Sequence, residues 1–298
     1  MLCLLRADLF RAFGAPRLRG WALPVAAAVA VYSLLSVGIT WFVGSDLYVE
    51  LARAMGSTET YESLGATAAL ASPVALWSSS FAGSGMLGLA ACFSMAWPQV
   101  LDTRDGFAKS LCAGLASRVP LLVERCLFAG IVSLVYLLVG VAFSSVPAAM
   151  LGLSVGPGDP LACLAWLGLL WVATWAMAVV TLALCWFFRK TMPTCYITAF
   201  LVASASLPQL INALGYAGPG ALFSFLAPLQ PQLFTASQWF SSMVYKNVCL
   251  GMEALTLPAW GLVDVPGGFV GQALLACALW GAVCVAVMVW RGRRSDLA

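Results

Sequence analysis

Hydrophobic positions dominate this chain, and they gather into long runs that shorter polar stretches separate. The first run extends from Trp21 to Val43 without a charged residue. A helix needs about 20 apolar residues to cross the hydrocarbon core of a bilayer, which is about 30 Å thick. Runs of this length predict transmembrane helices. We expect six of them, over residues 22–43, 74–100, 122–146, 161–188, 194–214 and 269–290.

The segment before the first run is predicted to be an interfacial helix. In residues 1–20, apolar side chains recur at positions 2, 5, 9 and 13, with Arg6 and Arg11 elsewhere around the helix. This spacing is typical of an amphipathic helix that lies at a membrane surface. Gly14 and Pro16 are expected to end it just before the first span.

The segment between the fifth and sixth runs is different in kind. Residues 215–268 are apolar in part, but Pro219, Pro228 and Pro231 interrupt them. A seventh span would also move the basic tail to the opposite side of the membrane. We therefore predict a re-entrant or purely extracytoplasmic segment here, because proline breaks a continuous helix and irregular backbone needs protein or water around it.

Composition supports the membrane class and excludes several others. The chain is 62% hydrophobic and 9% charged, with a mean hydropathy of +0.95, whereas soluble domains are about 45–50% apolar and about 25% charged. Histidine is absent, which removes histidine bases and most zinc and haem sites. No phosphate-binding GxxxxGK[ST] motif occurs, and the ten cysteines form no CxxC pair. We expect an all-α integral membrane protein, residues 1–298 forming one transmembrane domain without a catalytic centre, metal or cofactor.

Lysine and arginine predict the orientation. With six spans, 13 of the 15 basic residues fall on the side that carries both termini, and only Arg53 and Lys246 fall on the other. Basic residues concentrate on the cytoplasmic side of membrane proteins. Both termini are therefore predicted to be cytoplasmic, and Cys249 is the one cysteine expected on the outer side.

Two sets of residues inside the spans are candidates for packing or for lining a pathway. Small residues recur at every fourth position of the second span, at Ser80, Ser84, Gly88, Cys92 and Ala96. Such a stripe lets another backbone approach closely, either within the protomer or at a surface that slides during transport.

The fifth span carries Gln209 and Asn212 near its outer half. Polar amides at membrane depth need partners or water. These two residues are therefore candidates to line a pathway.

Charge is concentrated in the loop 101–121, between the second and third predicted spans. It includes Asp102, Arg104, Asp105, Lys109 and Arg118. A loop that only marks topology needs positive charge alone. Mixed signs beside a short helix-compatible run fit a surface docked to another protein, and a solvated connector is the alternative.

Here the sequence resembles a known family. The pattern DxxxGxxKSLxxxxxxR, from Asp102 through Gly106, Lys109 and Ser110 to Arg118, is similar to the loop between spans two and three of ABC-2 type transporter permeases. The likeness is closest to the branch linked to bacitracin and lantibiotic export or self-protection. Family members often carry threonine where this chain has Phe107.

The resemblance implies a function and partners. It implies that residues 101–121 hold a coupling helix that contacts a separate ABC ATPase subunit, and that a second permease, identical or paralogous, completes the transporter. The expected location is the bacterial cytoplasmic membrane. The expected substrate is a peptide antibiotic, a bacteriocin or another amphipathic molecule, and no nucleic-acid partner is expected.

Two other classes remain open at this stage. One is an ion-coupled carrier, although no predicted span has an ionisable residue near its centre, where carriers often place one. The other is a membrane enzyme or an accessory protein without transport activity, although no catalytic constellation is present in the sequence.

Overall fold

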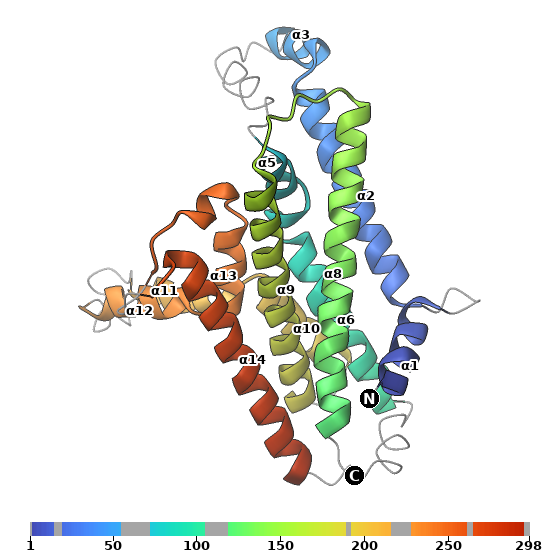
Figure 1. The fold of residues 1–298 in the computed structure, drawn as a ribbon, viewed down its shortest axis with the longest axis vertical. Helices are drawn as coiled ribbons and strands as arrows, with labels where there is room; N and C mark the ends of the chain where they lie inside the picture. Colours follow the sequence, from blue (N-terminus) through green and yellow to red (C-terminus); the bar gives the residue numbers. More distant parts are fainter. Residues whose placement is uncertain are drawn as a thin grey trace.

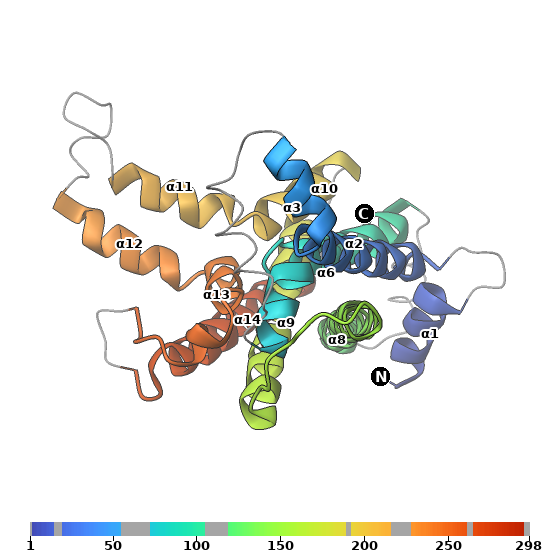
Figure 2. The same ribbon diagram turned by 90° about the horizontal axis from the view of Figure 1, so that it is seen from above.

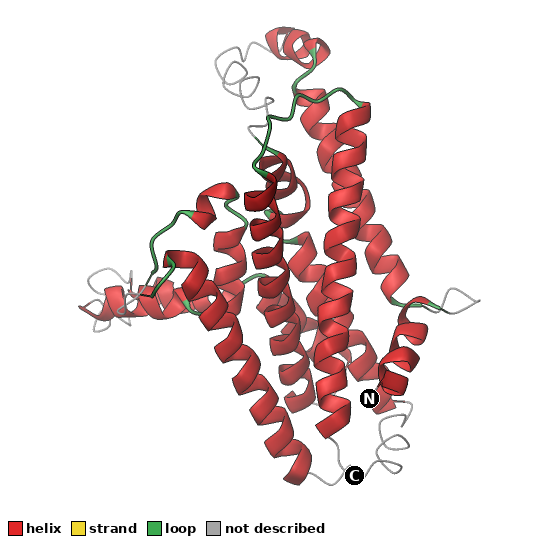
Figure 3. Ribbon diagram, in the orientation of Figure 1, coloured by secondary structure: helices red, strands yellow, loops and turns green. Residues whose placement is uncertain are grey.

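The computed structural model describes residues 2–14, 20–54, 72–104, 119–188, 192–215, 228–260 and 265–294. These residues are helical or form turns and short loops, with no strand among them (Figure 3). The elements are α1 (Leu2–Phe13), α2 (Ala22–Val43), α3 (Asp46–Ala54), α5 (Pro73–Trp77), the π-helix η1 (Ser78–Ala82), α6 (Met86–Arg104), α8 (Val119–Met150), α9 (Pro160–Phe188), α10 (Met192–Ala203), α11 (Ser206–Gly215), α12 (Gln230–Gln238), α13 (Ser241–Val248), the 3₁₀-helix η3 (Met252–Leu255) and α14 (Gly268–Arg294).

Four helices are long and apolar enough to cross a membrane by themselves, namely α2, α8, α9 and α14. Two bent pairs also pass this test together: Pro73–Ala82 with Met86–Val100, bent by 47°, and Pro193–Ala203 with Ser206–Leu214, bent by 59°. The chain is thus an all-helical protein with four to six candidate spans. The prediction of an all-helical, membrane-type fold is confirmed, and the second and fifth predicted spans are both bent.

Helix α9 forms the centre of the bundle. It packs against α6, α8, α10, α13 and α14 (Figures 1 and 2). In its most apolar stretch 61% of the residues are buried, compared with 28% in α2 and in α14. Large apolar side chains on the outer helices are exposed, for example Leu35 and Ile39 on α2. Because water-soluble proteins rarely expose apolar surface on this scale, these outer faces are suited to lipid.

The two ends of the bundle differ in what they carry. Helix α1, the start of α8 and the last turns of α14 lie at one end, which we call the basal end, and α3 lies at the opposite end (Figure 1). Helices α11 and α12 pack against each other and project sideways from the bundle in both views (Figures 1 and 2). In the described part of residues 215–268, no helix passes the length and hydropathy test.

Helix boundaries follow local sequence signals. Helix α1 ends at Phe13, as predicted, and the Gly14 N–H donates to the Phe10 carbonyl at 2.7 Å to close its last turn. Helix α8 is longer than predicted, with 32 residues that continue through Pro147. At 1.5 Å per residue it is about 48 Å long, and its upper turns extend past α9 (Figure 1).

Candidate functional site

The second span is broken at the serine-rich stretch that joins α5 to α6. Residues Ser78–Ala82 form a π-helix, and a turn through Gly83 and Gly85 follows before α6 begins. Hydroxyls of Ser79, Ser80 and Ser84 donate to backbone carbonyls three residues earlier in the chain. Such local bonds often bend helices, and π-helical turns occur mostly as bulges inside α-helices, frequently at functional sites. Gly85 has φ +77°, a conformation that glycine adopts without strain.

Tyr245, on α13, satisfies the backbone groups that this break exposes. Its hydroxyl donates to the Ala82 carbonyl at 2.9 Å and accepts from the Gly88 N–H at 3.3 Å. The Cys249 thiol also donates to the Ala82 carbonyl, at 3.3 Å. Unpaired backbone groups are costly where water is absent, so α13 stabilises the broken span.

Cys249, the one cysteine expected on the outer side, is a poor reporter of that side. It is only partly exposed, and burial raises the pKa of its thiol to about 12. Because the thiolate is the reactive species, this cysteine reacts slowly at neutral pH.

The break divides the predicted stripe of small residues, so the expectation of one smooth stripe is wrong. Ser80 lies before the turn, and Gly88, Cys92 and Ala96 lie after it and are buried. Ser84 lies within the turn and is exposed. A Cβ atom on Gly88 would lie 3.2 Å from Met177 Cε and 3.3 Å from Tyr245 Cζ. Gly88 is therefore a packing residue inside the protomer, which was one of the two predicted roles.

The fifth span is broken between α10 and α11. Ala205 has φ +54° and is the one non-glycine residue with positive φ in the described part of the chain. It is completely buried, so neighbouring side chains hold it in place. The hydroxyls of Ser204 and Ser206, on either side of it, are hydrogen-bonded to each other. Backbone conformations of this kind concentrate at functional sites, where the surrounding structure maintains them.

The predicted pathway residues Gln209 and Asn212 both lie on α11. Gln209 is exposed, and Asn212 is partly buried with its Oδ1 atom shielded and without a hydrogen-bond partner in the described structure. Neither residue lines the apolar groove that their neighbours Leu207 and Pro208 reach.

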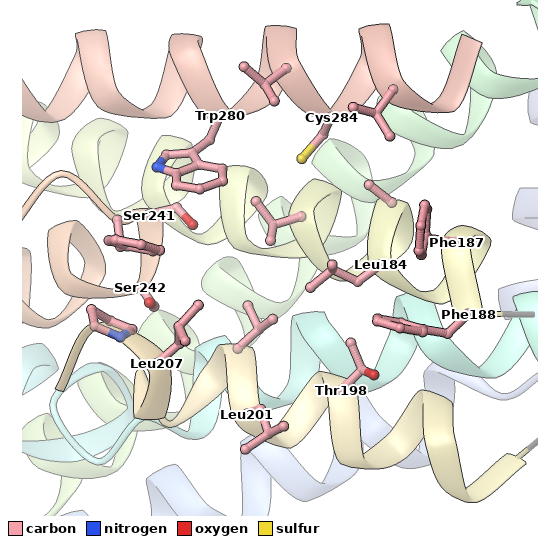
Figure 4. A pocket seen from close by; sticks show the side chains of 17 residues that line it. Leu184, Phe187, Phe188, Thr198, Leu201, Leu207, Ser241, Ser242, Trp280 and Cys284 are labelled. Atoms are coloured by element: carbon pink, nitrogen blue, oxygen red, sulfur yellow. The ribbon is translucent and has the colours of Figure 1, made fainter. Parts of the chain in front are cut away.

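That groove lies between α9, α10 and α14, and its volume is about 410 Å³ (Figure 4). This volume is within the range of small-molecule sites, about 300–1,000 Å³. Ser241, Ser242 and Trp280 lie at one end, and Phe187 and Phe188 lie at the other end (Figure 4). The sequence did not predict the groove, because its residues are apolar like those of every other helix face.

A cluster of charges is buried at the basal end, where α1 packs against α8. Arg125 Nε lies 3.2 Å from Asp8 Oδ2 and 3.7 Å from Glu124 Oε2, and an Arg11 nitrogen lies 3.5 Å from Asp8 Oδ1. Asp8, Glu124 and Arg125 are all buried. Two carboxylates and two guanidinium groups make the cluster electrically neutral, as buried charges require. The sequence contained these residues but gave no indication that they meet.

The predicted coupling segment lies next to this cluster in the sequence. Asp102 and Arg104 are in the last turn of α6. Asp105, Gly106, Lys109 and Arg118 lie outside the described residues, so their predicted role stays a prediction. Helix α8 begins at Val119, and its second turn carries Arg125.

Neither a metal site nor a similarity to known proteins narrows the function further. Among the described residues, no group of three His, Cys, Asp or Glu side chains is placed to hold a metal ion. No protein-family model, curated protein or solved structure matches the chain significantly. The class that the fold defines is a multi-pass, all-helical membrane protein with four to six candidate spans, two of them broken.

Proposed function

We propose that this chain is the membrane-spanning permease subunit of an ATP-driven transporter of the ABC-2 type, and that it works as an exporter. A separate ATPase subunit binds at residues 101–121, and the bundle alternates between two packings. The cargo is a peptide antibiotic, a bacteriocin or another amphipathic molecule. The chain lies in a bacterial cytoplasmic membrane with both termini in the cytoplasm.

The observation that carries this proposal is the buried link between α1 and α8. The ion pair between Asp8 and Arg125 connects the interfacial helix to the span that directly follows the charged segment. Removing one partner of a buried pair typically costs about 3–5 kcal/mol, so the pair favours contact between α1 and α8. A displacement of residues 105–118 by a partner would therefore move α1 and α8 together.

The two broken spans support transport over a purely structural role. Discontinuous membrane helices recur at the binding sites of transporters. Here the halves containing α6 and α10 pack directly against each other. Two breaks in neighbouring spans provide a place where the bundle can change its packing without unfolding a helix.

A second permease completes the proposed transporter. Six spans are half the number expected from the resemblance, and α2 and α14 are the least buried of the four unbroken spans. Their outer faces offer apolar surface for a second copy or a paralogue as well as for lipid.

Exchanging charges in the coupling segment tests the proposal. The double variant Asp105→Lys with Lys109→Asp keeps the net charge, so membrane insertion should be unchanged. If a partner surface docks here, like charges then meet, and co-purification of the ATPase and substrate-stimulated ATP hydrolysis should both fall. Gly106→Val should impair hydrolysis in the same way if Gly106 forms the turn into the coupling helix.

The matched control exchanges charges at the opposite end, with Glu50→Arg and Arg53→Glu on α3. This control should retain both the ATPase and its activity. If no ATPase co-purifies with the unaltered chain from its native membrane, the transporter proposal fails. If the ATPase is retained equally by all variants, residues 101–121 are a solvated connector.

A further inference from the structure

One end of the apolar groove is polar, and it coincides with the start of α13. Phe240, Ser241 and Ser242 all line the groove, and they are the N-cap and the first two residues of this helix. Ser241 is 4% exposed and Ser242 is 5% exposed. Figure 4 shows both serines at the same end of the groove as Trp280. The groove therefore ends in a buried position at the N-terminus of a helix.

The N-terminus of α13 has no side-chain cap. Phe240 occupies the N-cap position with an extended backbone, and its ring cannot accept a hydrogen bond from the N–H groups that follow. The Phe240 carbonyl accepts from the N–H groups of Met243 and Val244, at 2.9 Å in each case. The N–H groups of Ser241 and Ser242 come before these two and have no backbone acceptor among the described residues. Because a helix N-terminus also carries partial positive charge, this end of the groove favours a hydrogen-bond acceptor.

The hydroxyl groups of Ser241 and Ser242 add two further donors. Within the described residues, neither hydroxyl is hydrogen-bonded, although buried hydroxyl groups usually have a partner. The other polar side chains of the described lining are already bonded. Trp280 Nε1 donates to the Trp239 carbonyl at 2.8 Å, and the Thr198 hydroxyl donates to a carbonyl of its own helix at 2.8 Å. The side-chain donors that remain for an occupant are those of the two serines.

The rest of the groove is apolar and open to the outside of the bundle. Phe187, Leu201 and Val283 line it and are 44%, 47% and 46% exposed, respectively. None of the described lining residues is charged. A molecule from the surrounding bilayer would therefore enter sideways, with its apolar body along these side chains and its polar group at the buried serines.

The same lining limits the charge of that polar group. A cation is disfavoured, because a helix N-terminus is equivalent to about half a positive charge. An anion would be buried without a cationic side chain in the described lining, and an uncompensated buried charge is costly. An uncharged carbonyl oxygen has two lone pairs and accepts hydrogen bonds without either cost.

We propose that the groove binds a lipophilic molecule with an uncharged carbonyl group, such as an acyl ester or amide, whose oxygen accepts hydrogen bonds from Ser241 and Ser242. Its apolar body lies between α9, α10 and α14. The Phe240 ring packs against Trp280 with the ring centroids 5.1 Å apart, so α14 helps to hold the polar end in place. This site goes beyond the proposed function, because it requires neither the ATPase nor transport.

The class of ligand is tested by photolabelling and competition. The probe is N-methyldecanamide with a diazirine at the end of its chain. It is added to the full chain in nanodiscs of phosphatidylcholine with ether-linked chains, which contain no competing carbonyl group. After illumination, peptide mass spectrometry should locate adducts on groove-lining residues of α9, α10 or α14. At matched concentrations in the bilayer, methyl decanoate should compete as well as unlabelled amide, whereas decanoate and decyltrimethylammonium should each need about tenfold more.

Serine variants test the polar end. Ser241→Ala and Ser242→Ala should each lower the apparent affinity for the probe about fivefold, which corresponds to about 1 kcal/mol for one hydrogen bond. The matched control is Ser133→Ala on α8. It removes a buried hydroxyl that donates to the Ala129 carbonyl at 2.8 Å and does not line the groove, so the affinity should be unchanged.

A groove-filling variant tests the apolar part. Val283→Phe should reduce labelling, because the larger ring occupies the groove. The control Leu279→Phe changes an exposed residue of α14 that does not line the groove, and it should label as the unaltered chain does. All variants are compared after size-exclusion chromatography shows the same single species. The serine variants remove only one oxygen atom each, so they test the proposal even if Val283→Phe does not fold.

Three results would overturn the proposal. The first is unchanged affinity in both serine variants, and the second is labelling mainly outside the groove. The third is equal competition by decanoate or by decyltrimethylammonium, which would show a carboxylate site or binding through the chain alone. None of these results depends on ATPase binding, so they leave the proposed function untouched.

Discussion

Single residues maintain the break in the second span. Tyr245 is buried, with 2% of its surface exposed. Its hydroxyl is hydrogen-bonded to Ala82 on one side of the turn and to Gly88 on the other. Gly88 allows this because its missing side chain leaves room for the tyrosine ring. Glycine at this position therefore lets the Tyr245 side chain reach the backbone of α6.

Replacing Gly88 with leucine should destabilise the bundle. The new side chain would have to displace Met177 or the Tyr245 ring, at a cost of about 1–3 kcal/mol for overpacking. Thermal unfolding of the protein in nanodiscs measures the change. Gly168→Leu is the control, because nothing lies within 4 Å of a Cβ atom at that position on α9. Equal unfolding temperatures for the two variants would contradict the packing role.

At the scale of elements, the bend between α10 and α11 lies at Ala205, which is buried and has a positive φ angle. Ala205 has a left-handed backbone conformation. It joins α10, which packs within the bundle, to α11, which projects sideways from it (Figures 1 and 2). The bend also brings Leu207 and Pro208 to the groove. The break thus helps to shape the groove.

The variant Ala205→Gly should be neutral or slightly stabilising. Glycine removes left-handed strain of about 1–2 kcal/mol and adds about 0.5–1 kcal/mol of chain entropy to the unfolded state. Ala203→Gly lies at a buried helical position two residues earlier. It adds the same entropy to the unfolded state but removes no left-handed strain from the folded state. Chemical unfolding should therefore separate the two variants by about 1–2 kcal/mol. If Ala205→Gly is as destabilising as Ala203→Gly, the bend stores no strain.

At the scale of the whole molecule, one buried helix is surrounded by spans with apolar outer faces. The buried fraction falls from 61% for α9 to 28% for α2 and α14. Charged groups collect at the ends instead, with the ion-pair cluster and the basic turns of α14 at the basal end. This arrangement matches the dielectric profile of a bilayer, in which charge is costly at the centre and tolerated near the surface.

Cysteine labelling tests the orientation of the whole molecule. Cys3 is exposed on α1 at the basal end, and Met150→Cys places a thiol at the end of α8, where the methionine is 83% exposed. With a cytoplasmic basal end, a membrane-impermeant maleimide should label position 150 in intact cells and leave Cys3 unlabelled. Both thiols should react after the cells are opened. Labelling of Cys3 in intact cells would reverse the proposed orientation.

The sequence by itself determined the class of the fold and much of its plan. Runs of about 20 apolar residues have few stable solutions other than membrane helices, because a bilayer has a fixed thickness and offers no backbone partners. The end of α1 at Gly14 was also predictable, since a glycine and a nearby proline interrupt helical spacing. The basic residues gave an orientation that remains a prediction.

Only the tertiary structure decided which faces are buried and where helices break. In a span that is apolar all round, periodicity does not distinguish the face toward protein from the face toward lipid, so the groove could not be located. The break at η1 depends on Tyr245, which lies 157 residues from Gly88 in the chain. The ion pair likewise joins Asp8 to Arg125. Neither of these two contacts could be predicted from the local sequence. Long-range packing selects among conformations that the local sequence allows about equally.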